Sequence, residues 1–562
     1  MILPKFSAYL SPLTIEFVYF VINGLFLFQF VRVGYCIEVS GYEGGTMYLV
    51  TAREMQQMDK ETIDDIGIPG RILMENAGAG AFRFMGRVFP DLAGKSIGVV
   101  AGRGNNGGDG FVIARYLSQN SISVKVYLLC EKGRVQGDAR ENLNLMAPLG
   151  VPVVEIPDVA TFKKQKTAMR RHDVWVDSIF GTGLNSDVKG HYKEVILFLN
   201  ALKKPVFAVD IPSGLNADNG QVCGVCIQAQ ATATFAFPKI GHVVYPGAAY
   251  TGKLDIIDIG VPGQVADNIC PQQFVLEKEA LREVLQERNP NTHKGRTGHL
   301  LAIAGSTGKS GAAAMTATAA MRAGAGLVTL GVPRSLNSVL ESQVTEVMTY
   351  ALPETTDHML DISALDALQA LMAGKNCLAI GPGMGTAEET KQLLFQLLKK
   401  ISIPVVIDAD GLNLLSERPG VLRSLKTPVI LTPHPGEMGR LCGLLPGAVQ
   451  KDRIGRARDL ATSYGVHVVL KGARTVMAHP DGRVYVNLTG NPGMASGGMG
   501  DVLTGVIAGF VAQGYKPEDA VHLGVFLHGA AADHLSVHKG PFGYLATDLM
   551  SQLPHQIGKL FN

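Results

Sequence analysis

Short apolar runs alternate with amphipathic segments from Met47 to about Val261. A buried run of four to eight residues indicates a strand, and a 3.6-residue apolar period indicates a helix. This half is typical of a doubly wound α/β domain with a mainly parallel sheet. The loop GRGNNGGDG is expected at residues 102–110. The pattern predicts helices over 54–66, 72–89 and 111–120, and strands within 95–102, 123–130, 173–183 and 205–216.

The alternation returns after a looser stretch between Val261 and Thr297, so we place a domain boundary near Cys270. The expected domains are residues 47–270 and 271–562. Each predicted strand of the second half ends in glycine, proline or a polar cluster. In open α/β sheets ligands bind beyond the carboxyl ends of the strands, so these ends are expected to meet at one site. The strands are predicted within 299–305, 377–381, 403–409, 427–432 and 466–471.

Residues 1–46 differ from the rest of the chain. The stretch 13–33 is nearly all apolar and is interrupted by Glu16, Asn23 and Gln29. Its length suffices for a membrane span, but the polar interruptions and the sparse basic flank argue against one. No small-residue cleavage site of a signal peptide follows. Three interpretations stay open: an extension foreign to the soluble domains, a membrane anchor, or a signal segment.

Composition narrows the class of protein. The 562 residues are 46% hydrophobic and 18% charged, which indicates two to four well-buried globular domains. A net charge of +2 gives no electrostatic reason to expect nucleic acid as a partner. The seven cysteines are scattered, which fits a reduced cytoplasmic protein. Cys223 and Cys226 form a CxxC, but no second pair stands at zinc spacing.

The glycine-rich segment Asn491–Asp501, NPGMASGGMGD, precedes an apolar helical run. Glycines that open a helix expose backbone N–H groups and the positive end of the helix dipole, which suits a phosphate. Asp501 would repel that phosphate, so a base acting on a nearby hydroxyl is the sharper interpretation. The alternative is that Asp501 only caps the helix.

A second glycine motif, GRGNNG at 102–107, fits G-x-G-x-x-G, and Glu131 stands where a ribose-binding acid would. The continuation NNGGDG departs from that pattern, because it places two amides and a carboxylate where a diphosphate needs bare backbone. Amide oxygens of Asn105 and Asn106, beside Asp177 and the hydroxyl of Ser213, would suit a hard cation instead. The alternative is that the asparagines only stabilise turns.

Other polar residues stand at predicted strand ends. GSTGKS at 305–310 is two residues too short for a phosphate-binding P-loop, which we exclude. Lys471 is a candidate phosphate partner if its neighbours hold it, and His434 lies between two prolines. Asp408 and Asp410 are either caps or substrate contacts.

Together these motifs carry a family resemblance from Met47 to near the C-terminus. NNGGDG, DSIFGTG and VDIPSG resemble the NAD(P)H-hydrate epimerase domain. AGSTGKSG, GPGMG, DADGLN, TPHPGE, KGART and NPGMASGGMGD resemble the ribokinase-like, ADP-dependent NAD(P)H-hydrate dehydratase domain. In this order they resemble the bifunctional NAD(P)H-hydrate repair enzymes. The resemblance implies a Rossmann-like three-layer α/β domain followed by a ribokinase-like α/β domain.

The resemblance also implies an isomerase and a lyase. The first half would interconvert R- and S-NAD(P)HX, in which water has added to the reduced nicotinamide ring, with a potassium ion held by Asn106, Asp177 and Ser213. The family positions that contact NAD(P)HX correspond here to Asn105, Asn106, Gly107, Gly108, Asp109, Gly181, Thr182, Gly183, Leu184, Asn185, Ser186, Asp187 and Asp210.

The second half would use ADP, with magnesium, to dehydrate the S epimer, with Asp501 as the catalytic base. The hydrate would contact Ala312, Gly385, His434 and Asp501. The adenine nucleotide would contact Lys471, Gly472, Ala473, Arg474 and Thr475, and Asn491, Pro492, Gly493, Met494, Ala495, Ser496, Gly497, Gly498, Met499 and Gly500.

The expected partners are therefore NADHX, NADPHX and ADP, with no nucleic acid, and a membrane only if residues 1–46 form a true anchor. A homo-oligomer in the cytoplasm is expected. The alternative function is a ribokinase-type small-molecule kinase fused to a dinucleotide-binding or non-catalytic module.

Overall fold

The computed structural model describes residues 21–22, 25–26 and 47–561. Within the unit of residues 1–34, strands β1 (Val21–Ile22) and β2 (Leu25–Phe26) pair antiparallel. The rest of the apolar stretch 13–33 lies outside the described residues, so the three interpretations of residues 1–46 stay predictions. Among the described helices, none combines the length and apolar character needed to cross a bilayer.

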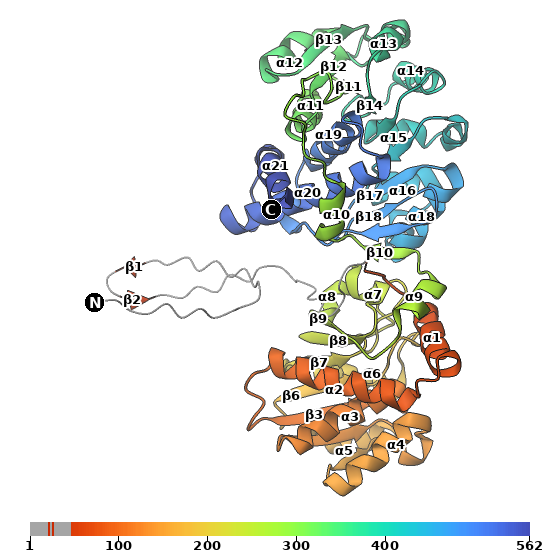
Figure 1. The fold of residues 1–562 in the computed structure, drawn as a ribbon, viewed down its shortest axis with the longest axis vertical. Helices are drawn as coiled ribbons and strands as arrows, with labels where there is room; N and C mark the ends of the chain where they lie inside the picture. The colour runs from red at the N-terminus through yellow and green to blue at the C-terminus, as the bar shows by residue number, and fades with distance from the viewer. Residues whose placement is uncertain (1–20, 23–24, 27–46, 562) are drawn as a thin grey trace. The chain divides into compact units, whose positions relative to one another are not determined.

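The first half contains a seven-stranded parallel sheet with the order β5-β4-β3-β6-β7-β8-β9. Its strands β3 and β6 to β9 are labelled in Figure 1. Every predicted strand of this half is present, and β5, β8 and β9 are additional. The chain moves outward from β3 to β5 and then from β6 to β9, so the strand order reverses between β3 and β6. The strands are β3 Ser96–Ala101, β4 Ser123–Leu128, β5 Val153–Glu155, β6 Val174–Ser178, β7 Val206–Val209, β8 Ala231–Phe235 and β9 Lys253–Ile257.

Helices pack on both faces of this sheet. Successive residues of β3 alternate between two apolar clusters: Val99 belongs to one and Val100 to the other. The sheet is therefore covered on each side, as the continuous apolar strands indicated. The helices are α1 Ala52–Lys60, continued by a π-helical turn at Glu61–Asp65, α2 Gly70–Val88, α3 Asn105–Gln119, α4 Gly137–Met146, α5 Val159–Met169, α6 Gly190–Leu202, α7 Ile240–Val243, α8 Ala248–Thr251 and α9 Gly263–Ile269.

The predicted loop at 102–110 is wrong beyond Gly104, because α3 already begins at Asn105. Glycine disfavours a helix interior, which is why the sequence suggested a loop. Close packing accounts for the glycine here: a Cβ on Gly107 would lie 2.2 Å from the carbonyl oxygen of Gly102. The NNGGD segment therefore forms the first turn of a helix.

The second half contains a ten-stranded sheet with the order β10-β19-β18-β17-β16-β15-β14-β11-β12-β13. Its pairs are parallel except β17–β18 and β18–β19, which are antiparallel. The five predicted strands are β11, β14, β15, β16 and β17, and the others are additional. The strands are β10 Gln273–Val275, β11 His299–Ile303, β12 Leu327–Pro333, β13 Met348–Leu352, β14 Cys377–Ile380, β15 Val405–Ile407, β16 Val429–Leu431, β17 His467–Leu470, β18 Val476–Ala478 and β19 Val484–Val486.

This sheet is also covered on both faces, since Leu300 and Leu301 of β11 belong to different apolar clusters. The α/β fold class predicted from the sequence is thereby confirmed. The helices are α10 Lys278–Val284, α11 Ser310–Arg322, α12 Asn337–Gln343, α13 Leu365–Met372, α14 Glu388–Leu398, α15 Asp410–Leu415, α16 Pro435–Cys442, α17 Pro446–Lys451, α18 Arg453–Tyr464, α19 Met499–Ala512, α20 Pro517–His538 and α21 Ala546–Phe561.

The first described residues of the long segment 47–561 join the second sheet. The N–H of Leu49 donates to the carbonyl of Gln273 at 2.8 Å, and the N–H of Val275 donates to the carbonyl of Met47 at 2.9 Å. Leu49 is fully buried in a core cluster of the second half. Residues 47–49 thus stabilise the second half of the protein, although they precede the first half in the sequence.

Candidate active sites

A cavity of about 1140 Å³ lies beyond the carboxyl ends of the strands of the first sheet. The segments that follow β3, β4, β6 and β7 all contribute to its wall, and α1 and α2 close other sides. The cavity includes the segments after β3 and β6, between which the strand order reverses. That is the place where open α/β sheets bind their ligands.

The start of α3 faces this cavity with Asn105, Asn106 and Asp109. The first N–H groups of a helix have no partner within the helix and attract anions. A Cβ on Gly102 would lie 2.1 Å from the carbonyl oxygen of Ile179, so only glycine lets this turn approach the segment after β6. The two motifs NNGGDG and DSIFGTG are thereby brought side by side.

Asp177 is fully buried at the end of β6 and is held by Ser213. Its Oδ1 accepts a hydrogen bond from the Ser213 hydroxyl at 2.6 Å, and its Oδ2 accepts one from the Ser213 N–H at 2.8 Å. Burial raises the pKa of Asp177 to about 6, although these hydrogen bonds oppose the rise. Asn106 is also buried, and among the described residues neither of its amide atoms has a hydrogen-bond partner.

Four charged side chains form a cluster at the cavity. Lys239 Nζ lies 2.7 Å from Asp210 Oδ1 and 2.9 Å from Thr234 Oγ1, and the lysine is almost completely buried. Burial raises the pKa of Asp59 to about 6, with Lys239 opposing the rise and Asp210 adding to it. Burial, followed by the charges of Asp210 and Asp59, raises the pKa of Asp109 well above its ordinary value.

Most of the predicted NAD(P)HX residues line this cavity, but not all. Gly181 lies between Asn106 and Asp210, because a Cβ on it would be 3.4 Å from the Asn106 Cβ and from Asp210 Oδ2. Gly107 packs on Gly102 and Gly108 packs on Met74, so neither lines the cavity, and Asp187 is exposed outside it. The predicted residues in the lining are Asn105, Asn106, Asp109, Gly181, Thr182, Gly183, Leu184, Asn185, Ser186 and Asp210.

The second half has its own charge cluster, at the carboxyl ends of β15 and β17. Lys471 Nζ lies 2.6 Å from Asp408 Oδ1 and 3.8 Å from Glu437 Oε2. The hydroxyl of Thr504, on α19, donates to Asp408 Oδ2 at 2.7 Å. Burial opposes the charged form of Lys471, but Asp408 and Glu437 nevertheless raise the pKa of this lysine. It is therefore a fixed cation rather than a solvated one.

Asp501 lies in the first turn of α19 and is not the helix cap. The N-cap is Gly498, with φ of +87°, and no side chain caps the helix. Burial raises the pKa of Asp501 to about 6; the charge of Asp408 adds to the rise and that of Lys471 opposes it. A carboxylate with such a pKa is suited to accept a proton near neutral pH.

His434 is half-exposed and caps α16. Its Nδ1 accepts hydrogen bonds from the N–H groups of Gly436 at 2.9 Å and Glu437 at 3.4 Å, while the Glu437 carboxylate accepts the N–H of His434 at 2.8 Å. Burial, with the charge of Lys471 next, lowers the pKa of His434. The ring is thus a neutral group beside Lys471, and not a free loop histidine.

Asp410 connects Gly385 and Lys309. Its Oδ2 accepts the N–H of Gly385 at 3.0 Å and lies 2.8 Å from Lys309 Nζ. Ala312 belongs to the same region, because a Cβ on Gly383 would lie 2.9 Å from the Lys309 Cβ and 3.1 Å from the Ala312 Cβ. The charges of Asp408 and Asp410 both raise the pKa of Asp501, so Asp410 and the Lys471 cluster lie near the same carboxylate.

The glycine-rich segment has a held end and an exposed end. The Asn491 side chain accepts from the Gly493 N–H at 3.0 Å and from the Tyr544 hydroxyl at 2.6 Å, and donates to Asp533 at 2.9 Å. Residues 495–497 are exposed, and Gly500 lies against Lys471, where a Cβ would be 3.3 Å from Nζ. The exposed turn, the free start of α19 and one lysine are thus next to each other.

The predicted segment 471–475 lies beside this turn only in part. Gly472 has φ of +139° and Arg474 has φ of +58°, so the chain turns sharply after Lys471. The Arg474 guanidinium donates to the carbonyl of Leu488. Arg474 therefore fixes the segment before the glycine-rich turn.

Comparison with known proteins identifies the family of this chain. A family model described as NAD(P)H-hydrate dehydratase matches residues 300–555, and one described as YjeF-related protein N-terminus matches residues 70–241. The bifunctional NAD(P)H-hydrate repair enzyme Nnr of Moorella thermoacetica is 44% identical over 515 residues, which are 92% of this chain and 97% of that protein. The chain belongs to the family of bifunctional NAD(P)H-hydrate repair enzymes.

Other relatives extend over the same length. The repair enzyme Nnr of Escherichia coli is 36% identical over 510 residues, covering 89% of this chain and 92% of that protein. Among solved structures, the ADP/ATP-dependent NAD(P)H-hydrate dehydratase from Bacillus subtilis, co-crystallized with ATP/Mg²⁺, is 32% identical. It covers 51% of this chain and 98% of its own, with a TM-score of 0.45. The family resemblance stated from the motifs is confirmed.

The sequence did not point to four residues of these sites. Lys239 and Asp59 enter the first cavity from the segment after β8 and from α1, and Glu437 and Thr504 contact the Lys471 cluster from helices. Lys239 follows a strand end, a signal that could have identified it. Asp59 looks like one of many polar residues on an amphipathic helix, and only its burial distinguishes it.

Proposed function

We propose that this chain repairs hydrated nicotinamide cofactors in two steps. The first half epimerises R- and S-NADHX and NADPHX, and the second half uses ADP to dehydrate the S epimer, releasing NAD(P)H, AMP and phosphate. The observation that carries the proposal is Asp501, a partly buried carboxylate with a raised pKa placed at a glycine-opened helix start beside Lys471. A carboxylate is unfavourable next to a phosphate site unless it takes part in the reaction.

In the dehydration, Asp501 accepts the proton of the ring hydroxyl. The oxygen of that hydroxyl attacks the terminal phosphoryl group of ADP, and AMP leaves. The C–O bond of the resulting phosphate ester then breaks, and phosphate departs with the bonding electrons. Loss of the proton on the neighbouring ring carbon restores the double bond of NAD(P)H. Lys471 and the free N–H groups at the start of α19 stabilise the charge on the transferring phosphoryl. Phosphorylation converts a poor leaving group into a good one.

The nucleotide is placed by the segments 471–475 and 491–500, and the hydrate by Ala312, Gly385, His434 and Asp501. Magnesium accompanies ADP, whose phosphate oxygens are its preferred ligands. The glycine-rich turn contacts the nucleotide through its backbone N–H groups. The side chain of Asn491 is already engaged in hydrogen bonds with Gly493, Tyr544 and Asp533.

A potassium ion in the first half fits the residues present. Asn106 has a buried amide without a partner, and Asp177 and Ser213 supply carboxylate and hydroxyl oxygens. Hard cations prefer such oxygen donors. When bound, the ion supplies a fixed positive charge at the cavity that holds the segments 105–109 and 181–187 in place for the hydrate.

Epimerisation needs an acid and a base, and the charge cluster at the cavity offers both. The carbon that bears the hydroxyl also bears the ring nitrogen. Asp59, with a pKa of about 6, takes the hydroxyl proton, and the C–N bond opens to an aldehyde and an enamine nitrogen. Asp109, protonated because its pKa is raised, donates its proton to that nitrogen. Closure on the other face of the aldehyde returns both protons and gives the opposite epimer.

One assay tests the proposal as a whole. Purified full-length protein is incubated with mixed hydrate epimers, with and without ADP, and the absorbance of reduced cofactor is followed. Complete recovery with ADP, and none without it, is expected. Recovery of only the S fraction would contradict the proposed epimerase activity. A stable phosphorylated product, or hydride transfer, would favour the alternative of a ribokinase-type kinase fused to a dinucleotide-binding module. The homo-oligomeric state and the cytoplasmic location remain predictions.

A further inference from the structure

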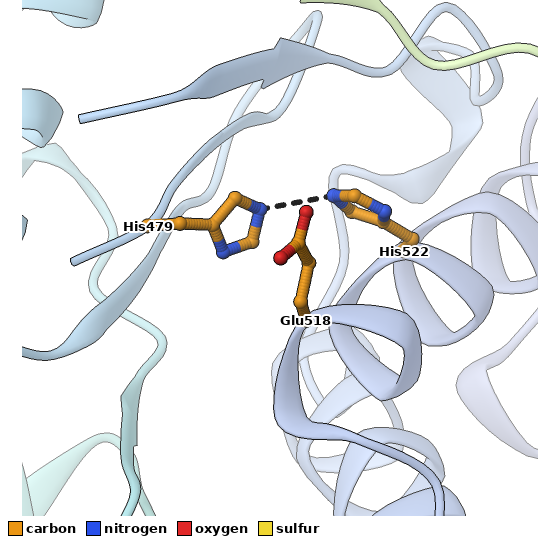
Figure 2. A group of neighbouring side chains, drawn as sticks. All are labelled: His479, Glu518 and His522. Atoms are coloured by element: carbon orange, nitrogen blue, oxygen red, sulfur yellow. Dashed lines mark hydrogen bonds between the residues drawn. The ribbon is translucent and has the colours of Figure 1, made fainter. Parts of the chain in front are cut away.

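Away from both sites, two histidines and a glutamate converge between the second sheet and α20. His479 follows β18, and Glu518 and His522 stand one turn apart near the start of α20 (Figure 2). Their candidate ligand atoms all lie within 4.8 Å of one another. His479 and His522 are 1% and 8% exposed, so this is a buried group rather than a chance meeting of surface side chains.

We propose that His479, Glu518 and His522 form a structural zinc site that fixes α20 to the second sheet. Two imidazoles and a carboxylate are a donor set that zinc uses in proteins, with a fourth position left for water. At least one of the facing Nε2 atoms of His479 and His522 carries no proton, because an N–H···N hydrogen bond needs an unprotonated acceptor.

The two histidine nitrogens already lie close to the spacing that zinc requires. The two Nε2 atoms, of His479 and His522, face each other at 2.9 Å. Around a tetrahedral zinc ion with bonds of about 2.05 Å, two ligand nitrogens stand about 3.3 Å apart. An increase of a few tenths of an ångström in the distance between the two nitrogens, within reach of side-chain rotation, would admit the ion. Glu518 lies beside this pair in Figure 2 and is partly exposed, which leaves a route of entry from solvent.

The surrounding residues orient the ligands as in known zinc sites. His479 Nδ1 lies 2.8 Å from His467 Nδ1, so His479 can donate its remaining proton there and keep Nε2 free for the metal. Metal-bound histidines almost always donate their other N–H in this way. One oxygen of Glu518 accepts from Arg483 at 2.8 Å, and the described residues give its other oxygen no hydrogen bond.

The charges around the site also permit a cation. Arg483 is the nearest positive charge, but it is paired with Asp481 at 2.6 Å as well as with Glu518 at 2.8 Å. Two carboxylates therefore surround one guanidinium. The two carboxylates outweigh the single positive charge of Arg483 beside the site.

The position of the site indicates a structural role. His467 stands at the amino end of β17, whereas Lys471 follows its carboxyl end, so the histidines lie at the opposite edge of the sheet from the Lys471 cluster. From Glu518 and His522, α20 continues to Asp533, which holds the backbone of Gly490 and the side chain of Asn491. Zinc would thus anchor the helix that supports the glycine-rich turn.

The test uses full-length protein stripped with a chelator. Zinc titration should show one ion bound per chain and a raised Tm, and cobalt in its place should give the visible absorption bands of a four-coordinate site. The double variant His479→Gln/His522→Gln should lose both signals. His467→Ala should bind zinc about 10- to 100-fold more weakly, because it removes the partner that orients His479.

A second histidine group provides the matched control. The rings of His534 and His538 on α20 lie 4.2 Å apart by their centroids, and His555 on α21 lies 4.9 Å from His534. His538→Ala/His555→Ala should leave zinc binding unchanged. Loss of zinc binding in this variant would show that the control histidines bind the ion, and would overturn the proposal.

Two further results would also overturn it. If stripped wild-type protein binds no zinc, the three histidines form only a hydrogen-bonded chain. If the double glutamine variant retains zinc with the same cobalt spectrum, the ligands are elsewhere. Should that variant fail to fold, Glu518→Gln decides, since it changes a partly exposed side chain of the same size. Weaker zinc binding supports the site, and unchanged binding excludes it.

Discussion

The Nζ atom of Lys471 lies 2.6 Å from Oδ1 of Asp408, and both groups are largely buried. The other oxygen of Asp408 accepts a hydrogen bond from the hydroxyl of Thr504, which lies on the helix that carries Asp501. One carboxylate therefore holds the lysine after β17 and the helix start of α19 in fixed relation. The lysine cannot be removed without leaving a buried charge unpaired, which makes it a sensitive position for experiment.

Lys471→Met should abolish most ADP-dependent dehydration, with a fall of about 10²- to 10³-fold, because a fixed cation at the phosphoryl group is lost. It should also reduce the free energy of unfolding by about 3–5 kcal/mol, since Asp408 stays buried without its partner. Dehydration kinetics and chemical denaturation measure the two effects.

The double variant Lys471→Met/Asp408→Asn separates them. Asparagine keeps an acceptor for Thr504 but carries no charge, so much of the lost stability should return while dehydration stays low. Recovery of dehydration in this variant would show that Lys471 acts only by supporting the fold.

Dehydration of pure S epimer should depend on pH through Asp501. Its pKa is raised to about 6, so the base is protonated below that pH and ionised above it. The value of kcat/KM should therefore fall on the order of tenfold for each pH unit below about 6 and level off above it. The use of pure S epimer excludes a contribution from Asp59. A flat profile across this range would argue against Asp501 as the base.

Potassium dependence should follow Asp177. Asp177→Ala removes a buried carboxylate that Ser213 holds through two hydrogen bonds. Epimerisation should fall and lose its response to potassium, while dehydration of the S epimer persists. Asp173→Ala, at the exposed start of the same segment, is the control and should epimerise normally. Equal epimerisation rates in the two variants would contradict the assignment of Asp177 as a ligand of the cation.

A chain truncated to begin at Met47 should keep both activities. The new terminal amine would lie next to Glu277, which already accepts the Met47 N–H at 3.1 Å. A chain that begins at Ala52 should be less stable by about 2–5 kcal/mol, because it loses the buried Leu49 and two sheet hydrogen bonds. Thermal unfolding of the two chains gives the comparison. Unfolding of the Met47 chain would show that residues 1–46 are structural.

The strands that sequence reasoning found are those buried on both faces, such as Val405–Ile407, because they are continuous apolar runs. It missed Met348–Leu352, an edge strand with exposed residues, and Leu327–Pro333, in which threonine and glycine interrupt the apolar pattern. It placed the start of α3 too late, because the glycines that pack at Gly102 and Gly107 look like loop residues.

The candidate sites divide in the same way. Asp177 lies at the end of a strand, and Asp408 and Lys471 follow strands, so the carboxyl-end rule could find them from the sequence. Burial is a tertiary property, however, and the raised pKa of Asp59 arises from it. His479 and His522 are 43 residues apart and meet only because the fold brings the residue after β18 to α20. No local pattern could have joined them.

The most direct test of the repair activity is Asp501→Asn. Asparagine keeps the size of the side chain in the first turn of α19 but cannot accept the hydroxyl proton. ADP-dependent dehydration of S-NAD(P)HX should fall by about 10²- to 10⁴-fold, while nucleotide binding persists and epimerisation by the other half is unchanged. Dehydration at near wild-type rate by a normally folded Asp501→Asn protein would contradict the account.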